Sequence, residues 1–163
     1  MTESHRVELA KQDMVFSAAH FITFNGNVCE RLHGHNYRVR CRVEDQLDEN
    51  HYVIDFIALR DELRGIVDRL DHHVLLPTEH PRIRVTAGDS EVEAVFEDRR
   101  WVFPRGDCVL LPVANTTAEL LAGEIGRELL DRLAERLGRR LSQLEIAVDE
   151  NGGQWAVWEY RRQ

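Results

Sequence analysis

Residues 35–45 read HNYRVRCRVED, and apolar side chains alternate there with arginines. The two sets are Tyr37, Val39, Cys41 and Val43 on one side, and Arg38, Arg40 and Arg42 on the other. Successive residues of a strand point to opposite faces of a sheet. This period of two therefore predicts a strand with one buried face and one polar face.

The segments around this strand predict an α+β fold. Residues 6–16 predict an earlier strand, and residues 142–149 and 154–160 predict a hairpin across Asn151-Gly152-Gly153. Apolar residues switch to helical spacing over 55–70, with Asp55 as the N-cap, and again over 117–137, with Gly138 as the stop. We expect an antiparallel sheet with both helices packed on one face.

Residues 78–112 do not fit this simple pattern. They contain four short stretches that favour strands, at 83–86, 91–97, 101–103 and 108–111. We interpret 78–112 as an insertion, with an extra hairpin, within one domain that spans residues 1–163.

Bulk composition limits the classes of function. The chain has 163 residues, enough for one hydrophobic core, and a formal net charge of -8, which argues against nonspecific nucleic-acid binding. Its three cysteines are an odd number without a regular framework, which indicates free thiols in a reducing compartment. With no apolar signal region at the N-terminus and no long apolar run, we expect a cytoplasmic protein without a membrane partner.

The histidines at 33 and 35 are the clearest local signal of chemistry. In an extended segment, His33 and His35 point to the same side, and Gly34 between them allows another backbone to approach closely. His20, which follows the first strand, supplies a third nitrogen in this hypothesis. Three neutral histidines with an open fourth position are typical of catalytic zinc. The alternative is a pair of ordinary loop histidines.

Cys29 and the Asp71-His72 pair are candidate proton-transfer groups. Cys29 is either a small buried residue or a base, in which case a nearby metal and arginines would lower the pKa of its thiol. Asp71-His72 is either a polar pair at a helix C-terminus or a proton relay in which the carboxylate orients the imidazole.

Taken together, six segments resemble the family of 6-pyruvoyl- and 6-carboxy-tetrahydropterin synthases. They are FSAAH at 16–20, CERLHGH at 29–35, VIDF at 53–56, LDHHVLL at 70–76, NTTAELLA at 115–122 and VDEN at 148–151. They occur in the family's order and span most of the chain outside the insertion.

The resemblance implies a tunnelling fold (T-fold), in which a four-stranded antiparallel sheet carries two helices on one face. Subunits of this fold join edge to edge into an oligomeric barrel, and a hexamer is expected. The implied roles are zinc on His20, His33 and His35, proton transfer by Cys29, Asp71 and His72, and pterin binding by Glu150 and Thr117. The implied substrate is 7,8-dihydroneopterin triphosphate.

The product branch depends on two neighbouring residues. The three-residue gap between Cys29 and His33 resembles the 6-carboxy enzymes of queuosine synthesis, which also release acetaldehyde and triphosphate. Glu30 resembles a third branch, which yields 6-hydroxymethyl-dihydropterin for folate synthesis. A chain with both residues looks like the type proposed to serve both pathways, although Glu30 is alternatively a solvated carboxylate.

Other readings stay open. Within the enzyme class, the alternatives are the 6-pyruvoyl synthase and the folate-directed lyase. A different class is a catalytically silent protein that binds zinc or pterin. A zinc hydrolase is disfavoured, because the sequence has no helical His-Glu-x-x-His motif. Thr116 and Glu119 have a separate explanation as a helix capping box, and Asn151 and Leu120 depart from the family's usual residues.

Overall fold

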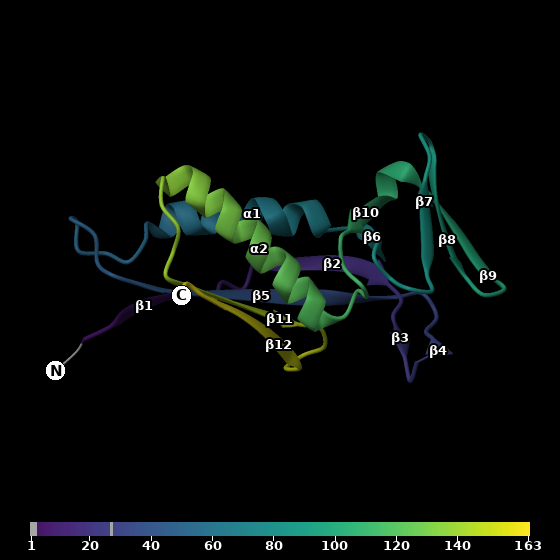
Figure 1. Cartoon of the computed structure of the whole chain (residues 1–163), viewed down its shortest axis with the longest axis horizontal. Helices are drawn as coiled ribbons and strands as arrows, with labels where there is room; N and C mark the ends of the chain where they lie inside the picture. Colours follow the sequence, from purple (N-terminus) through teal and green to yellow (C-terminus); the bar gives the residue numbers. More distant parts are fainter. Residues whose placement is uncertain (1–2, 27) are drawn as a thin grey trace.

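A computed structural model of the protein describes residues 3–26 and 28–163, and its main sheet carries two helices on one face (Figure 1). Over these residues the sheet has seven strands in the order β10-β6-β2-β5-β11-β12, with β1 also paired to β5. The strands are β1 (His5–Leu9), β2 (Val15–His20), β5 (His33–Asp45), β6 (His73–Pro77), β10 (Cys108–Leu111), β11 (Gln143–Asp149) and β12 (Trp155–Arg161). The helices are α1 (Phe56–Leu70) and α2 (Ala118–Leu137). The predicted α+β class and T-fold are confirmed.

The single strand predicted at 6–16 is wrong, because the chain leaves the sheet in the middle of it. The N–H of Met14 donates to the carbonyl of Lys11, which closes a turn between β1 and β2. Both strands then pair antiparallel with β5, β1 along its second half and β2 along its first half. β5 is thus the long central strand, and its buried residues are the alternating apolar set read from the sequence.

The main sheet is wider than the four antiparallel strands expected. Strands β2, β5, β11 and β12 are antiparallel neighbours, but β6 joins β2 in parallel and β10 joins β6 in parallel. Residues 108–111, which the sequence placed in the insertion, therefore belong to the main sheet. A parallel pair needs a long connection, and the segment between β6 and β10 supplies it.

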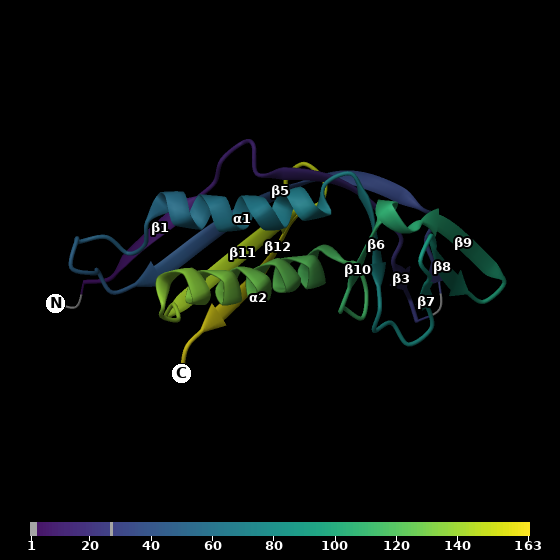
Figure 2. The ribbon, with the colours of Figure 1, turned by 90° about the horizontal axis from the view of Figure 1, so that it is seen from above.

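That segment forms a sheet of its own rather than a hairpin. Its three antiparallel strands are β7 (Arg84–Ala87), β8 (Glu91–Phe96) and β9 (Arg99–Pro104), followed by the short 3₁₀ helix η1 (Arg105–Asp107). This inserted sheet lies beyond the ends of the two helices (Figure 2). Next to it, β3 (Thr23–Phe24) and β4 (Val28–Cys29) form a small two-stranded ladder between β2 and β5 in the sequence.

Two predicted helix ends, the N-cap of α1 and the stop of α2, are confirmed. Asp55 accepts a hydrogen bond from the Ile57 N–H at 2.8 Å, and α2 ends at Gly138 with φ of 67°. That φ lies in the left-handed region, which glycine adopts at low cost. Among the described residues, neither helix combines the length and apolar character needed to cross a bilayer.

Two hydrophobic cores hold these layers together. The larger core fills the space between the helices and the main sheet. The smaller core joins the inserted sheet to the main sheet, and it includes Phe21, Leu76, Phe96 and Cys108. Phe21 directly follows His20, so the smaller core lies next to one of the candidate metal ligands.

Candidate active site

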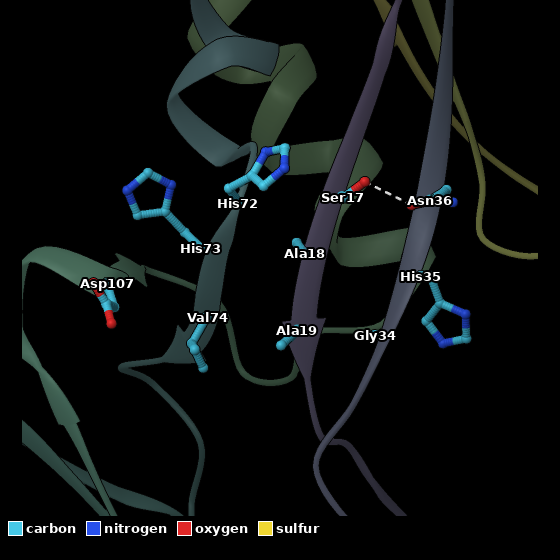
Figure 3. A pocket seen from close by; sticks show the side chains of 10 residues that line it. All are labelled: Ser17, Ala18, Ala19, Gly34, His35, Asn36, His72, His73, Val74 and Asp107. Carbon is cyan, nitrogen blue, oxygen red and sulfur yellow. Dashed lines mark hydrogen bonds between the residues drawn. The ribbon is translucent and has the colours of Figure 1, made fainter.

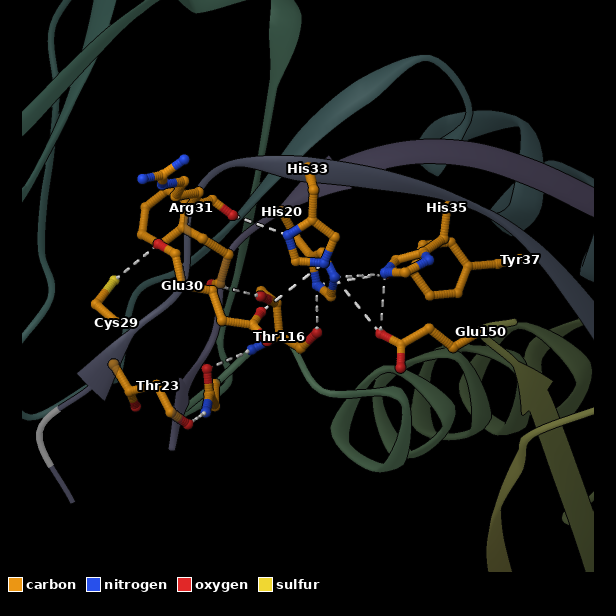
Figure 4. A network of polar contacts seen from close by, with 12 residues as sticks. His20, Thr23, Cys29, Glu30, Arg31, His33, His35, Tyr37, Thr116 and Glu150 are labelled. Atoms are coloured by element: carbon orange, nitrogen blue, oxygen red, sulfur yellow. Dashed lines mark hydrogen bonds and ion pairs between the residues drawn. The ribbon is translucent and has the colours of Figure 1, made fainter. Parts of the chain in front are cut away.

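The three predicted ligands lie together at one end of β2 and β5. The register pairs His20 of β2 with His33 of β5, and His35 lies two residues further on the same face. Their ring centroids are 4.8 to 5.2 Å apart, and one nitrogen from each ring can be chosen so that all lie within 4.8 Å of one another (Figure 4). This cluster can hold a metal ion.

Backbone carbonyls fix the orientation of two of these rings. The Nδ1–H of His20 donates to the carbonyl of Thr116 at 2.8 Å, and that of His33 donates to the carbonyl of Arg31 at 2.8 Å. In each ring Nε2 is then the nitrogen that can bind a metal. Burial is the main reason that the pKa of His20 falls to about 4. A neutral imidazole is the form that binds metal, so the donor set fits zinc.

Two carboxylates flank the histidines. Glu150 Oε1 lies 3.5 Å from His20 Nε2 and 3.7 Å from His35 Nε2, while Glu30 Oε2 lies 3.8 Å from His33 Nε2. Within residues 3–26 and 28–163, Glu30 Oε2 is buried and has no hydrogen-bond partner. A buried carboxylate oxygen without a partner is costly. A cation or polar ligand beside His33 would offset that cost, which further supports the fit to a metal.

Cys29 is half-buried at the end of β4, and its thiol turns toward its own neighbour. Its Sγ lies 3.6 Å from the carbonyl oxygen of Glu30. Burial raises the pKa of this thiol and outweighs the nearby Arg99, which lowers it. The arginine that lowers the thiol pKa comes from the inserted sheet, and the predicted lowering by a metal stays a prediction.

Asp71 and His72 form the predicted pair at the end of α1. Asp71 Oδ1 accepts from the Ser17 N–H at 2.7 Å, and Asp71 Oδ2 lies 2.8 Å from His72 Nδ1. These contacts, led by the Ser17 N–H, lower the pKa of Asp71. The His72 side chain is 82% exposed, so the pair presents an oriented imidazole to the outside of this chain.

This pair lies on the other side of the sheet from the three histidines. Together with Ser17, Gly34 and Asn36, His72 lines a hollow of about 450 Å³, which His35 also borders (Figure 3). Gly34 and Asn36 alternate with His33 and His35 along β5, so the two sets point to opposite faces. Within one chain, the hydrogen bonds and ion pairs described for the Asp71 and His72 side chains do not reach Cys29 or the three histidines.

Glu150 and Thr117 share a different hollow of about 410 Å³ at the start of α2. Thr117 Oγ1 accepts from the Leu120 N–H at 3.5 Å and is the N-cap of the helix. The capping box read from Thr116 and Glu119 is therefore wrong by one residue. Thr116 is fully buried instead, and its hydroxyl donates to the carbonyl of Phe21 at 3.3 Å.

Sequence reasoning missed two residues that shape the site. The Tyr37 hydroxyl lies 3.2 Å from His20 Nε2, and its place two residues after His35 on the same strand face was an available signal. Asp149 accepts from the N–H groups of Gly153 and Gln154 and from Arg38, so it organises the turn that carries Glu150. An aspartate shortly before glycines is a common turn signal.

A T-fold with three histidines at one sheet end and a carboxylate beside them defines a class, the pterin-processing enzymes of this fold. The chain belongs to the 6-pyruvoyl tetrahydropterin synthase family, whose profile matches residues 9–161. It is 31% identical over 144 residues to a Methanocaldococcus jannaschii protein provisionally described as 6-carboxy-5,6,7,8-tetrahydropterin synthase, with 88% of each chain covered.

Two solved structures of this family are also similar. Plasmodium falciparum 6-pyruvoyl tetrahydropterin synthase superposes with a TM-score of 0.90 at 30% identity, over 99% of this chain and 100% of that one. A Plasmodium vivax 6-pyruvoyltetrahydropterin synthase, in which a glutamate named as a catalytic residue is replaced by alanine, gives 0.88 at 28% identity, over 99% and 100%. Both alignments span the inserted sheet.

Proposed function

We propose that this protein is a zinc-dependent carbon–carbon lyase that converts 7,8-dihydroneopterin triphosphate to 6-carboxy-5,6,7,8-tetrahydropterin, acetaldehyde and triphosphate. The observation that carries the proposal is the placement of His20, His33 and His35 between two carboxylates, Glu150 on one side and Glu30 on the other. The name given to the Methanocaldococcus relative supports the 6-carboxy product. Such a product belongs to queuosine-type 7-deazaguanine synthesis.

The three histidines would hold the zinc ion through Nε2 of His20, Nε2 of His33 and a ring nitrogen of His35. When bound there, zinc supplies a Lewis acid next to the substrate's side-chain hydroxyls. Glu150 would accept hydrogen bonds from the amino group and a ring N–H of the pterin, a two-point match to a carboxylate. The hollow that Glu150 shares with Thr117 has the size of a small-ligand site.

Proton transfer would use groups from two subunits. Glu30 lies beside His33, whereas the His72 side chain is 82% exposed and lines the hollow with Ser17 and Asn36. We propose that the Asp71-His72 pair of one subunit completes the site of a neighbour in a homo-oligomer, with a hexamer as the expected size. Asp71 would keep the His72 imidazole oriented, and His72 would return a proton to the substrate.

One observation favours a second candidate function, the lyase that makes 6-hydroxymethyl-dihydropterin. Glu30 Oε2 lies 3.8 Å from His33 Nε2, while the Cys29 thiol faces the Glu30 carbonyl. Glu30 is thus the nearer candidate base in this structure. A catalytic glutamate is also named in the similar Plasmodium vivax enzyme.

Product analysis decides between these functions. Zinc-loaded protein is incubated with 7,8-dihydroneopterin triphosphate, and the products are identified by mass spectrometry. Acetaldehyde with a 6-carboxy pterin supports the main proposal, and 6-hydroxymethyl-dihydropterin supports the second. A 6-pyruvoyl pterin would identify a 6-pyruvoyl synthase, and zinc binding without turnover would show a silent binder. Comparing Cys29→Ala with Glu30→Gln then shows which side chain each product requires.

A further inference from the structure

We infer that the inserted sheet β7–β9 positions the Cys29–Glu30 segment for catalysis, and that Arg99 is its positioning residue. The claim that this contact supports turnover rests on the proposed function. The claim that Arg99 holds the backbone of Cys29 and Glu30 does not. The segment between the ligands His20 and His33 is held at several points by residues that come from 78–107. Arg99 supplies the contacts nearest to the candidate bases.

Arg99 binds the backbone of both candidate bases at once. Its Nη1 donates to the carbonyl of Cys29 at 2.7 Å, and its Nη2 donates to the carbonyl of Glu30 at 2.9 Å. A guanidinium has a planar, rigid set of donors that can bind two acceptors in a fixed relative orientation. Two consecutive carbonyls held in this way restrict the peptide that sets the directions of the Cys29 and Glu30 side chains.

Aromatic stacking holds Arg99 in place and links it to a metal ligand. The Arg99 guanidinium lies 4.6 Å from the centroid of the Trp101 ring, which is two residues along the same strand face. Trp101 in turn stacks on Phe21 at 4.3 Å, with an angle of 18° between the rings. Because Phe21 follows His20, one packed stack connects Arg99 to the histidine cluster.

The same segment is held at two further points. His80, at the start of the insertion, lies 2.8 Å from the Thr23 hydroxyl through its Nε2. Arg82 donates to the carbonyl of Gly26 at 3.2 Å and pairs with Glu97. The Glu30 N–H also donates to the Ile22 carbonyl at 2.9 Å. Most of the polar contacts that residues 78–107 make with this segment are to backbone groups, which suits a supporting role.

The test compares Arg99→Met with Arg100→Met in the full-length, zinc-loaded protein. Methionine keeps an apolar side chain next to Trp101 but removes the guanidinium N–H donors that bind the two carbonyls. Arg100 is the matched control, because it lies on the opposite face of β9, is exposed, and pairs with Glu93 within the inserted sheet. Arg99→Lys keeps the positive charge but lacks the planar two-donor geometry of a guanidinium. It therefore tests how far the charge alone restores function.

Three measurements are made on each variant: zinc content, amide hydrogen exchange of Cys29 and Glu30, and kcat and KM with product ratio. For Arg99→Met we expect unchanged zinc content and exchange of the two amides about 10-fold faster. We expect kcat to fall by about 10- to 100-fold with little change in KM, because the bases are misplaced while substrate binding is kept. Arg99→Lys should be intermediate, and Arg100→Met should match the wild type.

Equal exchange rates in Arg99→Met and Arg100→Met would overturn the inference, whatever the enzyme's activity. Faster exchange with unchanged kcat and product ratio would overturn the positioning role. If Arg99→Met does not fold, Arg99→Lys carries the same comparison. Absence of turnover in the wild type would instead contradict the proposed function, and the exchange data would still decide whether Arg99 holds the segment.

Discussion

The Nδ1–H of His20 donates to the carbonyl of Thr116, a residue 96 positions later in the chain, at 2.8 Å. This bond joins the end of β2 to the segment that leads into α2. The acceptor is a backbone carbonyl, so this hydrogen bond does not depend on the side chain of residue 116. The same segment carries Thr117 to the hollow beside Glu150. One hydrogen bond thus aligns the candidate metal cluster with the candidate substrate hollow.

Replacement of His33 by alanine should remove both zinc and activity. A ligand is lost from a three-histidine site, so zinc binding should weaken by more than the ~10–100-fold typical of outer-shell changes. Metal content after dialysis, measured by mass spectrometry, checks this. Cys29→Ala is the control and should keep its zinc. Retention of one zinc per chain at wild-type affinity in His33→Ala would show that the ligand assignment is wrong.

Mixed assemblies should recover activity that neither parent has. If the reaction requires Cys29, the Cys29→Ala and His72→Ala proteins should each be inactive alone. If His72 serves a neighbouring subunit, each site takes Cys29 from one subunit and His72 from the next. Random 1:1 mixing should then make about a quarter of all sites intact. Activity is measured after the subunits are dissociated and reassembled together. No recovery, despite proven exchange of subunits, would contradict a shared site.

Asp149→Asn should loosen the turn that presents Glu150. Burial raises the pKa of Asp149, but the Gly153 N–H and Arg38 outweigh it and the net shift is downward. Loss of the charged acceptor should cost roughly 1–3 kcal/mol of unfolding free energy. It should also raise KM, since Glu150 anchors the substrate in our proposal. Urea unfolding and steady-state kinetics test this, with exposed Asp131→Asn as the control.

Gly126→Ala should destabilise the fold although alanine favours helices. A Cβ at this position would lie 2.2 Å from two ring atoms of Trp158 on β12. Overpacking costs about 1–3 kcal/mol, against a helix gain of roughly 1 kcal/mol, so the net effect should be a lower Tm. Gly106→Ala is the control, because its Cβ would meet no atom within 4 Å. A Tm for Gly126→Ala at or above that of the wild type would refute this packing argument.

Stability should fall as the pH drops below 6.5, partly through His80. Its Nδ1 accepts the N–H groups of Arg82 and Ile83, which requires the neutral ring, and burial followed by Arg82 lowers its pKa below 6.5. The folded state then binds fewer protons than the unfolded state, so the contribution is complete above pH 6.5 and is lost toward the folded pKa.

His80→Gln should show a smaller loss of unfolding free energy between pH 7.5 and 5.5 than the wild type. Urea titrations of zinc-loaded protein at both pH values measure this. His5→Gln, in the exposed start of β1, is the control and should keep the wild-type dependence. An unchanged pH dependence in His80→Gln would show that protonation at His80 does not weaken the fold.

Local patterns in the sequence were enough to place most of the elements. The strand at 35–45, both helices and the C-terminal hairpin follow from periodicity and from Asp55, Gly138 and the Gly152-Gly153 turn, whereas the N-cap of α2 was placed one residue too early. These features depend on residues within a few positions of one another. The break between β1 and β2 was missed because apolar residues continue on both sides of it.

Only part of the candidate site could be predicted from the sequence. His33 and His35 share a strand face by spacing alone, and His20 and the Asp71-His72 pair were candidates from their residue types. The family resemblance added Glu150 and Thr117 and gave each residue a role. The opposite facing of His72 and the histidine cluster depends on how β6 joins β2, which is a pairing between distant segments. Spacing along the chain carries no information on that pairing.

The sequence by itself therefore determined the α+β class, the residues able to bind a metal, and the family. The tertiary structure decided what surrounds them: the parallel strands β6 and β10, the three-stranded inserted sheet, and Arg99 on the carbonyls of Cys29 and Glu30. The physical reason is that side-chain type and periodicity are local properties. A contact between an arginine and backbone carbonyls 69 and 70 residues away is set by packing, and any residue has such a carbonyl to offer.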